Sequence, residues 1–354
     1  MIFIQVISLL AFSLTCLNLI SIKTIKAKQS KLFASEKIDI LIPLRNEARN
    51  VVPLLKNLET APGQIYVLDD GSTDGTFKLL GQSRLPINIL KGKELPTGWL
   101  GKNYACHQLV AQSKGEYLVF LDADVRLAPG AIESSLEYME QRGWSFISPY
   151  PRQIAKGFLG HLIQPLLQWS WLSSVPLWFA HKFKIKSMIV ANGQFFIIKK
   201  SAYFAVGGHK AIKNKVLDDL QLARQLSQNG FVGGVIEGSR ISSCLMYDNG
   251  KALFNGYRKS LWAGFGSIVG SVFAFSILAL TGVINFFALE TNSSFKNAAV
   301  LIIISRIFSA VKTNSDLRSV VFHPIAVIVL LYLLTSSWLG KIRGTLTWRD
   351  RAII

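Results

Sequence analysis

The chain has 354 residues, of which 50% are hydrophobic, and its mean hydropathy of +0.34 is high for a soluble globular protein. Its formal net charge of +18 at pH 7 fits nucleic acid, anionic lipid or a phosphorylated ligand as a partner. Many basic residues flank apolar segments, however, which favours a membrane surface over a nucleic-acid groove. The three cysteines have no spacing that indicates a disulfide framework or a zinc site. We therefore expect a membrane protein with no nucleic-acid partner.

Residues 1–22 are almost uninterrupted in apolar character and are long enough to span a bilayer. A cleaved signal peptide is the alternative, but no basic residue precedes the apolar run. Basic residues follow it instead, at Lys23, Lys26, Lys28 and Lys31. We predict an uncleaved transmembrane anchor, with its N-terminus outside and the chain from residue 23 onward in the cytosol.

Between residues 37 and 240, short β-rich runs alternate with helical patterns. The predicted strands are 37–44, 64–70, 87–90, 116–124 and 144–150, and the predicted helices include 50–59, 101–113 and 129–142. Nearly continuous apolar strands that alternate with helices predict a mostly parallel sheet with helices on both faces. In such sheets the ligand binds beyond the carboxyl ends of the strands.

Three polar clusters follow strands one, two and four of this predicted sheet. They are "RNE" at 45–47, "DDGSTDGT" at 69–76 and "DAD" at 122–124. Each cluster alone has a simple explanation as a turn or a helix cap. All three together can converge on one crevice at the same edge of the sheet, which chance turns explain much less well.

Asp122 and Asp124 stand one residue apart at the end of a predicted buried strand. Two such carboxylates repel each other unless a cation lies between them, and a buried carboxylate is costly unless it is paired or bound to a metal. A solvated turn is the alternative, and D-x-D alone is too short to decide.

Two further groups of residues raise similar questions. A helix cap needs one acceptor, so it does not explain both Asp69 and Asp70; a carboxylate there can accept from the N3–H of uracil. Lys102 in "GWLGK" stands at the start of a predicted helix, where it can meet a diphosphate. An exposed surface lysine is the alternative.

The C-terminal region, residues 261–340, contains two long apolar segments. Residues 261–289 carry no charge, and residues 320–339 are similarly apolar. The stretch between them, 298–311, contains Arg306 and is of marginal length. Two crossings return the basic tail, 341–354, to the cytosol, whereas three place it outside. We predict two, with 298–311 tilted, re-entrant or interfacial.

In this order and at these spacings, "IPLRNE", "VLDDGSTDGT", "LPTGWLGK" and "FLDAD" resemble the family 2 glycosyltransferases, which have the GT-A (nucleotide-diphospho-sugar transferase) fold. The similarity continues through "ANGQFFIIKKSAYFAVGGH" at 191–209 and "VLDDLQLARQLSQNG" at 216–230, and it covers roughly residues 37–260. The GW-x-GK element, the single N-terminal anchor and the apolar C-terminus are similar to membrane glycosyltransferases acting on carotenoids, of the diaponeurosporenoate and chlorobactene type, and to hopanoid-associated members.

The resemblance implies a UDP-sugar donor and a divalent metal, Mg²⁺ or Mn²⁺, both of which suit carboxylate and phosphate oxygens. Asp122 would face the ribose and the metal, and Asp124 would bind the metal, which neutralises the departing diphosphate. The nucleotide pocket would be formed by Pro43, Arg45, Glu47, Asp69 and Asp70, with Asp70 and Asp69 on the uracil.

A second acidic pair, Asp218 and Asp219, matches the acceptor-side acidic motif of the family. Asp219 would be the catalytic base of an inverting displacement. For Asp218 a helix start is the alternative, because acidic residues favour that end. His209 in "GGH" is a lone histidine, which is more often structural than a ligand.

The chain departs from the processive members of the family, because their Q-x-x-R-W element is replaced here by "NGYRKSLW". Arg258 and Trp262 are expected to substitute in part, with Arg258 near the diphosphate. The missing element argues against a polymerising synthase. A nucleotidyltransferase is a different-class alternative, but "PLRNEARN" lacks a Gly-rich loop with a lysine finger. An inactive membrane scaffold is disfavoured, because buried acids without a ligand only destabilise.

Residues 155–186 are apolar and aromatic, with Trp169, Trp171 and Trp178 among leucines. A membrane crossing here would put "DAD" and "LDDL" on opposite sides, so we predict an interfacial amphipathic segment of a cytosolic domain, 37–260. This segment favours a lipid acceptor. We therefore expect transfer of one hexose, glucose first, to a carotenoid or related isoprenoid, with a hopanoid, polyprenyl phosphate or diacylglycerol as alternatives, by a multi-pass protein of the cell membrane.

Overall fold

The computed structural model describes residues 2–30, 32–183, 185, 188–288, 293–348 and 351–352. Its contacts divide the chain into two compact units, each built from separate stretches of sequence. We call residues 23–152 and 184–244 the sheet unit, and residues 1–22, 153–183 and 245–354 the helical unit. The predicted domain 37–260 is therefore shared between the units, because 153–183 and 245–260 group with the apolar helices.

The sheet unit is an α/β structure. Its strands are β1 (Ile38–Leu44), β2 (Gln64–Asp69), β3 (Asn88–Lys91), β4 (Tyr117–Leu121), β5 (Val125–Leu127), β6 (Phe146–Tyr150), β8 (Phe195–Lys199), β9 (Gly233–Glu237) and β10 (Ser242–Cys244), with β7 (Arg152–Gln153) at the boundary. Its helices are α2 (Ala48–Asn57), α3 (Thr76–Gly81), α4 (Gly101–Gln112), α5 (Ala131–Gln141), α8 (Lys200–Ala205), α9 (Gly208–Ala211) and α10 (Asp218–Gln228), with a 3₁₀ turn, η1 (Ser35–Lys37).

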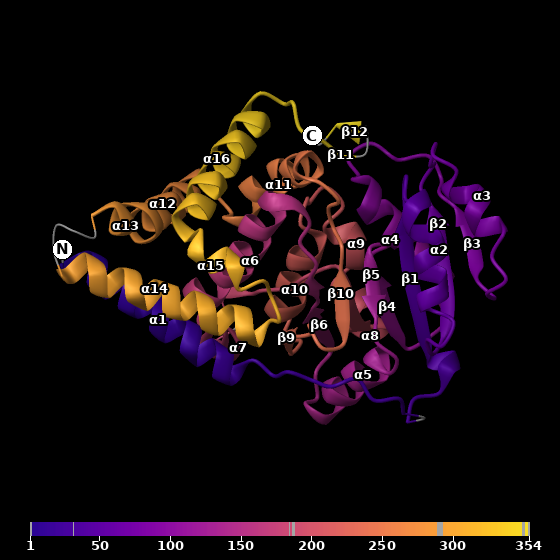
Figure 1. Ribbon diagram of the computed structural model, residues 1–354. Helices are drawn as coiled ribbons and strands as arrows, with labels where there is room; N and C mark the ends of the chain where they lie inside the picture. The colour runs from indigo at the N-terminus through magenta and orange to yellow at the C-terminus, as the bar shows by residue number, and fades with distance from the viewer. Residues whose placement is uncertain are drawn as a thin grey trace. The chain divides into compact units, whose positions relative to one another are not determined.

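The seven-stranded sheet has the order β3-β2-β1-β4-β8-β6-β9 (Figure 1). Strands β3, β2, β1 and β4 pair in parallel, and so do β6 and β9, whereas β8 is antiparallel to both β4 and β6. The prediction of a mostly parallel sheet is confirmed, and all five predicted strands are present. Strand β8, which the pattern alone did not predict, starts at the edge where its antiparallel neighbour β4 ends.

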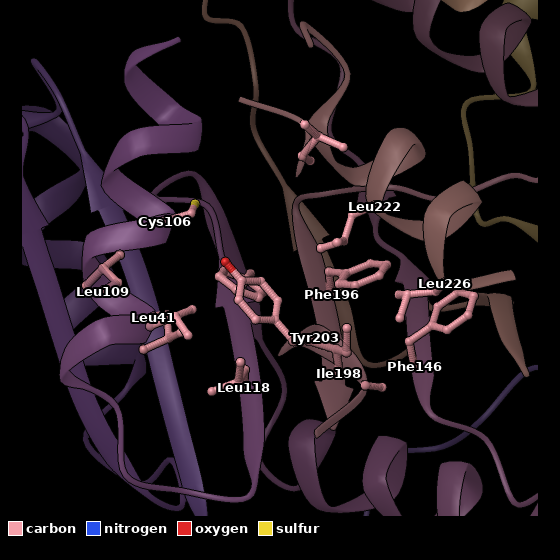
Figure 2. Close-up of a cluster of buried hydrophobic side chains, with 14 of the residues drawn as sticks. Leu41, Cys106, Leu109, Leu118, Phe146, Phe196, Ile198, Tyr203, Leu222 and Leu226 are labelled. Atoms are coloured by element: carbon pink, nitrogen blue, oxygen red, sulfur yellow. The ribbon is translucent and has the colours of Figure 1, made fainter. Parts of the chain in front are cut away.

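A hydrophobic core covers one face of this sheet. Figure 2 shows Leu41 and Leu118 from two neighbouring strands facing Cys106 and Leu109 of α4, with Leu222 of α10 farther along the same face. Side chains alternate between the two faces of a strand. The alternate residues Ile40, Ile42 and Val119 are also fully buried. Both faces are therefore covered, which is why these strands are apolar throughout.

The helical unit contains the long apolar helices. Its elements are α1 (Ile2–Ser21), α6 (Gly157–Ser174), α7 (Leu177–Phe183), α11 (Gly250–Gly264), α12 (Ile268–Ala279), a π-helical turn η3 (Leu280–Ile284), α13 (Asn285–Phe287), α14 (Ser293–Lys312), α15 (Arg318–Val321), α16 (His323–Ile342), β11 (Thr347–Trp348) and β12 (Arg351–Ala352). Helix α1 is tied to the α6–α7 junction, since Asn18 Nδ2 donates to Leu172 O at 2.8 Å and Val175 O at 2.7 Å.

Four helices of this unit are long and apolar enough to cross a membrane: Ile2–Ser21, Ile268–Phe287, Ser293–Lys312 and His323–Ile342. The first, second and fourth correspond to predicted spans. The stretch 298–311, predicted to be tilted, re-entrant or interfacial, belongs to the third of these helices. That helix starts at Ser293 and has 20 residues, so marginal length is no argument against a crossing. If all four cross, the basic tail and the sheet unit lie on opposite sides of the membrane.

The segment 155–186, predicted to be interfacial, forms α6 and α7, while Lys184 and Lys186 lie outside the described residues. Trp169 is not at an interface, because it is 3% exposed and its Nε1 donates to Ser305 Oγ at 2.9 Å inside the helical unit. Trp178, by contrast, is 63% exposed. The sequence pattern did not separate a tryptophan that packs between helices from one on the surface.

Candidate active site

The predicted polar clusters lie at one edge of the sheet, where β1, β2 and β4 end and β8 begins. The backbone N–H of Asp122, directly after β4, donates to Gln194 O at 3.0 Å, directly before β8. The antiparallel course of β8 thereby brings residues 192–194 to the edge that the parallel strands reach with their carboxyl ends. A hollow at this edge is lined by Pro43, Lys102, Cys106, Phe120, Leu121, Asp122, Gly193, Phe196, His209, Asp218, Asp219 and Leu222.

The first acidic pair lies in the turn between β4 and β5. Asp124 Oδ1 is buried and has no hydrogen-bond partner among the described residues, while the carboxylate also receives a hydrogen bond from the Cys244 thiol. Burial raises the pKa of Asp124 to about 6, assisted by the negative charges of Asp122 and Glu47. The carboxylates of Asp124, Asp122 and Glu47 therefore lie close enough to influence one another, and Asp124 Oδ1 is an acceptor without a donor among the described residues.

The carboxylate oxygens of Asp122 and Asp124 fit a divalent cation whose remaining ligands come from the substrate. Carboxylate oxygens suit Mg²⁺ and Mn²⁺, and Mg²⁺ commonly takes one or two carboxylates together with phosphate oxygens. Within the described ranges, no group of three or more His, Cys, Asp or Glu side chains forms a complete metal site. Asp124 and Asp122 would thus supply part of the ligand sphere, and a diphosphate would supply the rest.

The second acidic pair opens helix α10. Asp219 Oδ2 accepts from the backbone N–H of Gly193 at 2.5 Å, and its Oδ1 accepts from that of Leu220 at 2.7 Å. Burial raises the pKa of Asp219 to about 7, with the charge of Asp218 acting in the same direction. A Cβ atom at Gly193 would lie 2.8 Å from the Cβ of Asp219, so this close approach requires glycine.

Lys102 joins the two pairs. Its Nζ lies 2.8 Å from Asp122 Oδ1 and 3.7 Å from Asp218 Oδ2. Burial disfavours the ammonium, but the two carboxylates outweigh this effect and hold the pKa of Lys102 well above its ordinary value. Lys102 is therefore not an exposed surface lysine; it is the cation shared by one aspartate of each pair.

Asp218 also faces His209. The His209 Nε2 lies 3.9 Å from Asp218 Oδ2, and its Nδ1 lies 2.9 Å from the Tyr203 hydroxyl, which accepts from the His209 backbone N–H at 3.0 Å. The direction of the hydrogen bond between the Tyr203 hydroxyl and Nδ1 follows the tautomer of the ring, because the hydroxyl can both donate and accept. Burial lowers the pKa of His209 to about 4, so the ring is neutral at pH 7.

Sequence reasoning gave no site role to several residues of the hollow: Cys106, Phe120, Gly193, His209 and Leu222. A lone histidine is more often structural than a ligand, so the sequence alone assigns His209 no role in the site. The signal that pointed to it was the "GGH" within a stretch that resembled the family, but its contact with Asp218 spans nine residues and depends on how α9 and α10 pack. The structure places it 3% exposed at the hollow.

The residues assigned to the nucleotide form two interlaced loops after β1 and β2. The Arg45 Nη1 donates to the backbone carbonyl of Asp70, and Glu47 N donates to Thr76 Oγ1 at 2.9 Å. Asp69 Oδ2 accepts from Ser72 N at 3.2 Å, and its Oδ1 is buried without a hydrogen-bond partner in the described chain. Pro43 alone of the five assigned residues lines the hollow; Asp69 ends β2, and the other three lie in the loops after β1 and β2.

Arg258 belongs to the helical unit, where it lies on α11 and its Nη2 donates to Thr345 Oγ1 at 3.3 Å. Its suggested contact with the diphosphate stays a prediction. Trp262, its suggested companion, donates through Nε1 to Lys259 O at 3.0 Å and carries Lys341 Nζ 4.6 Å from its ring centre.

A mostly parallel sheet with acidic side chains beyond its strand ends is an architecture that binds substrates there. A carboxylate with a raised pKa that lines a hollow, as Asp219 does, is typical of catalysis. The class of protein defined in this way is an α/β enzyme.

Residues 39–220, just over half of the chain, match the family model described as glycosyl transferase family 2, and the protein belongs to this family. It is thus a glycosyltransferase, as the ordered motifs indicated, and membership in this family excludes the nucleotidyltransferase alternative.

Two relatives are 4,4'-diaponeurosporenoate glycosyltransferases of Staphylococcus. The protein of S. haemolyticus is 27% identical, over 72% of this chain and 68% of its own. That of S. aureus strain RF122 is 25% identical, over 77% of this chain and 74% of its own. Among solved structures, the mannosyltransferase PcManGT of Pyrobaculum calidifontis, in complex with GDP-Man and Mn²⁺, is 14% identical with a TM-score of 0.55, over 96% of this chain and 99% of that one. This likeness concerns the fold and confirms the predicted GT-A architecture.

Proposed function

We propose that the protein transfers one hexose, glucose first, from a UDP-sugar to the polar end of a membrane-dissolved carotenoid or related isoprenoid, with inversion and with Mg²⁺ or Mn²⁺. The observation that carries this proposal is the hollow at the strand ends, where Lys102 lies between one aspartate of each acidic pair. The relatives named as diaponeurosporenoate glycosyltransferases support a carotenoid acceptor. The four apolar helices support a membrane setting.

On the donor side, Asp124 and Asp122 would hold the metal, and Asp70 with Asp69 would hold the uracil. When bound, the metal would neutralise the charge that develops on the departing diphosphate. Lys102 would add a second positive charge beside the metal, because its ammonium lies 2.8 Å from Asp122 Oδ1. The residue itself belongs to the first turn of α4. A diphosphate beside Asp122 would therefore meet a positive side chain at a helix N-terminus.

On the acceptor side, Asp219 would act as the base. Two backbone N–H groups fix its orientation, and each carboxylate oxygen keeps a lone pair for the proton of an acceptor hydroxyl. Its pKa of about 7 makes it a stronger base than an ordinary aspartate while leaving about half of it ionised at pH 7. A carboxylic-acid acceptor would already be ionised and would have no proton to give up. Transfer to it would then not require the ionised form of Asp219.

The test is transfer itself. Purified protein in neutral-lipid nanodiscs, given radiolabelled UDP-glucose, should label a carotenoid acceptor, and EDTA should stop the reaction. Expression in hosts that make carotenoids, hopanoids, polyprenyl phosphates or diacylglycerol, followed by mass spectrometry for a hexose-sized gain, ranks the acceptors. Labelling of water-soluble acceptors alone would contradict the lipid assignment, and an inactive scaffold would label none.

We also propose that the sheet unit is cytosolic, where nucleotide sugars are made. A cysteine placed at the exposed Lys91 of β3 should resist a membrane-impermeant thiol reagent in sealed right-side-out vesicles. A second cysteine at Arg343, after α16, distinguishes the crossings: labelling from outside means that α14 crosses the membrane, and protection means that it does not. Labelling at Lys91 from outside would contradict the cytosolic assignment.

A further inference from the structure

Arg306 lies within α14 of the helical unit and is 1% exposed. Its Nη2 donates to Ser319 Oγ at 3.2 Å, whereas Nε and Nη1 have no hydrogen-bond partner among the described residues. Asp316, three residues before Ser319, is engaged elsewhere, with His161 Nδ1 at 2.8 Å and Arg318 Nε at 3.3 Å. Within the described ranges, Arg306 is in no ion pair.

The neighbours of Arg306 are polar or aromatic side chains, and one of them, His323, also lacks hydrogen-bond partners among the described residues. Its guanidinium lies over the ring of Trp169, 5.8 Å from the ring centre, and the ring of His323 meets Trp169 edge to face at 5.4 Å. His323 is fully buried, and neither of its ring nitrogens has a partner in the described chain. We call Arg306, Trp169, Ser319 and His323 the buried arginine site; its members come from α14, α6, α15 and α16.

The surroundings of this site make its positive charge costly. Leu166, Ile302 and Leu330, all 0–1% exposed, belong to the apolar core of the same unit. A buried charge without a counter-charge is strongly unfavourable, and a neighbouring aromatic ring offsets only part of that cost. Buried waters can satisfy the free N–H groups, but they do not supply the missing negative charge. Ionisable residues within membrane helices commonly mark substrate or ion sites.

We propose that the buried arginine site binds the anionic oxygen head of a membrane amphiphile, a lipid carboxylate or a lipid phosphate. The guanidinium supplies the charge and the free N–H groups of Nε and Nη1, and His323 supplies a further ring nitrogen. The apolar side chains around them suit the hydrocarbon part of the same molecule. A neutral lipid has no charge to offer and is excluded. This proposal does not depend on the sugar donor or the acceptor of the transfer reaction.

The experiment uses the full-length protein in phosphatidylcholine nanodiscs without donor or acceptor. The melting temperature is followed while oleate, phosphatidic acid, monoolein or inorganic phosphate is added. The wild-type protein should be stabilised by oleate or phosphatidic acid and not by monoolein. Arg306→Gln should melt above the wild type in phosphatidylcholine alone, because an unpaired charge is removed, and its response to the anionic amphiphiles should weaken by about tenfold or more in the midpoint concentration.

Arg318→Gln is the matched control, because it removes the same charge from a side chain that is 88% exposed and should keep the full response. Native mass spectrometry of the wild type should in addition retain one anionic amphiphile per chain, a result that does not depend on the folding of any variant. An equal response of Arg306→Gln and wild type, or no retained amphiphile, overturns the proposal. If inorganic phosphate stabilises the protein as strongly as oleate or phosphatidic acid does, the proposal of an amphiphile is overturned and the site binds free anions.

Discussion

The two acidic pairs of the sheet unit have one feature in common and differ in another. In each pair one aspartate, Asp122 or Asp218, lies beside the ammonium of Lys102, and the other has its pKa raised by burial. Asp124 keeps an oxygen without a hydrogen-bond partner in the described chain, whereas both oxygens of Asp219 accept backbone N–H groups. An open oxygen suits a metal ligand, and a carboxylate fixed on both sides suits a proton acceptor. Neighbouring carboxylates of the same type can thus serve different purposes.

A large effect on the catalytic step itself is expected at the second pair. Asp219→Asn keeps the shape of the side chain but removes the base, so kcat for a hydroxyl acceptor should fall by roughly 10²–10⁴-fold. Initial rates with radiolabelled UDP-glucose at saturating acceptor measure this. A kcat within about threefold of the wild type would deny Asp219 the role of base.

The first pair should show opposite effects on activity and stability. The raised pKa of Asp124 means that the folded state holds its proton up to about pH 6, so this residue costs stability as the pH rises through that value. With EDTA and no donor, Asp124→Asn should raise the free energy of unfolding at pH 8 by up to about 3 kcal/mol, and it should abolish transfer.

Asp122→Asn is the matched control for this prediction. Because Asp122 is paired with Lys102 at 2.8 Å, its replacement removes a favourable contact and should lower stability. Denaturant titrations of the two variants at pH 5 and pH 8 make the comparison. A loss of stability in both variants would show that the Asp124 carboxylate makes favourable interactions in the folded protein. The argument that its Oδ1 is open for a metal would then fail.

The pH dependence sharpens the difference between hydroxyl and carboxyl acceptors. If Asp219 must be ionised to take a proton, kcat for a hydroxyl acceptor should rise about tenfold per pH unit below about 7 and level off above it. A carboxylic-acid acceptor is ionised throughout that range, so its rate should not rise. Rates between pH 5.5 and 8.5 with matched acceptors decide this, and identical profiles would mean that another step limits both.

A smaller effect is expected at Tyr203. Its hydroxyl holds His209 Nδ1 and the His209 backbone N–H, so Tyr203→Phe frees the ring to turn away from Asp218. The loss of one or two hydrogen bonds should reduce kcat by about two- to tenfold with little change in the KM for the donor. A change confined to the KM for the donor would place His209 on the donor side instead.

Local sequence signals were sufficient for β1, β2, β3, β4 and β6, though not for β8 and β9, and for the three polar clusters at the ends of β1, β2 and β4. Runs such as "IDILIPL" form buried strands because both faces of the sheet are covered, and the parallel order then brings Asp69, Asp122 and the loop at Arg45 to one edge. The resemblance added Asp218 and Asp219, which the structure places in the same hollow as Asp122.

The remaining features depend on contacts between distant segments. The antiparallel insertion of β8 decides that Gly193 reaches Asp219, 26 residues away. The buried Trp169 finds its hydrogen-bond acceptor in Ser305, 136 residues away. The start of α14 at Ser293 lies in polar residues, "SSFKN", that a hydropathy pattern excludes from an apolar helix. Periodicity and composition do not encode such pairings.

The central claim is that the first acidic pair binds the metal and the second supplies the base. Donor binding tests this claim most directly. Isothermal titration of UDP-glucose with Mn²⁺ into Asp124→Asn and Asp219→Asn, beside the wild type, separates the two roles in one experiment. The account predicts that Asp219→Asn binds the donor like the wild type, whereas Asp124→Asn loses the part of the affinity that depends on Mn²⁺. Donor binding that survives in Asp124→Asn and is lost in Asp219→Asn would contradict it.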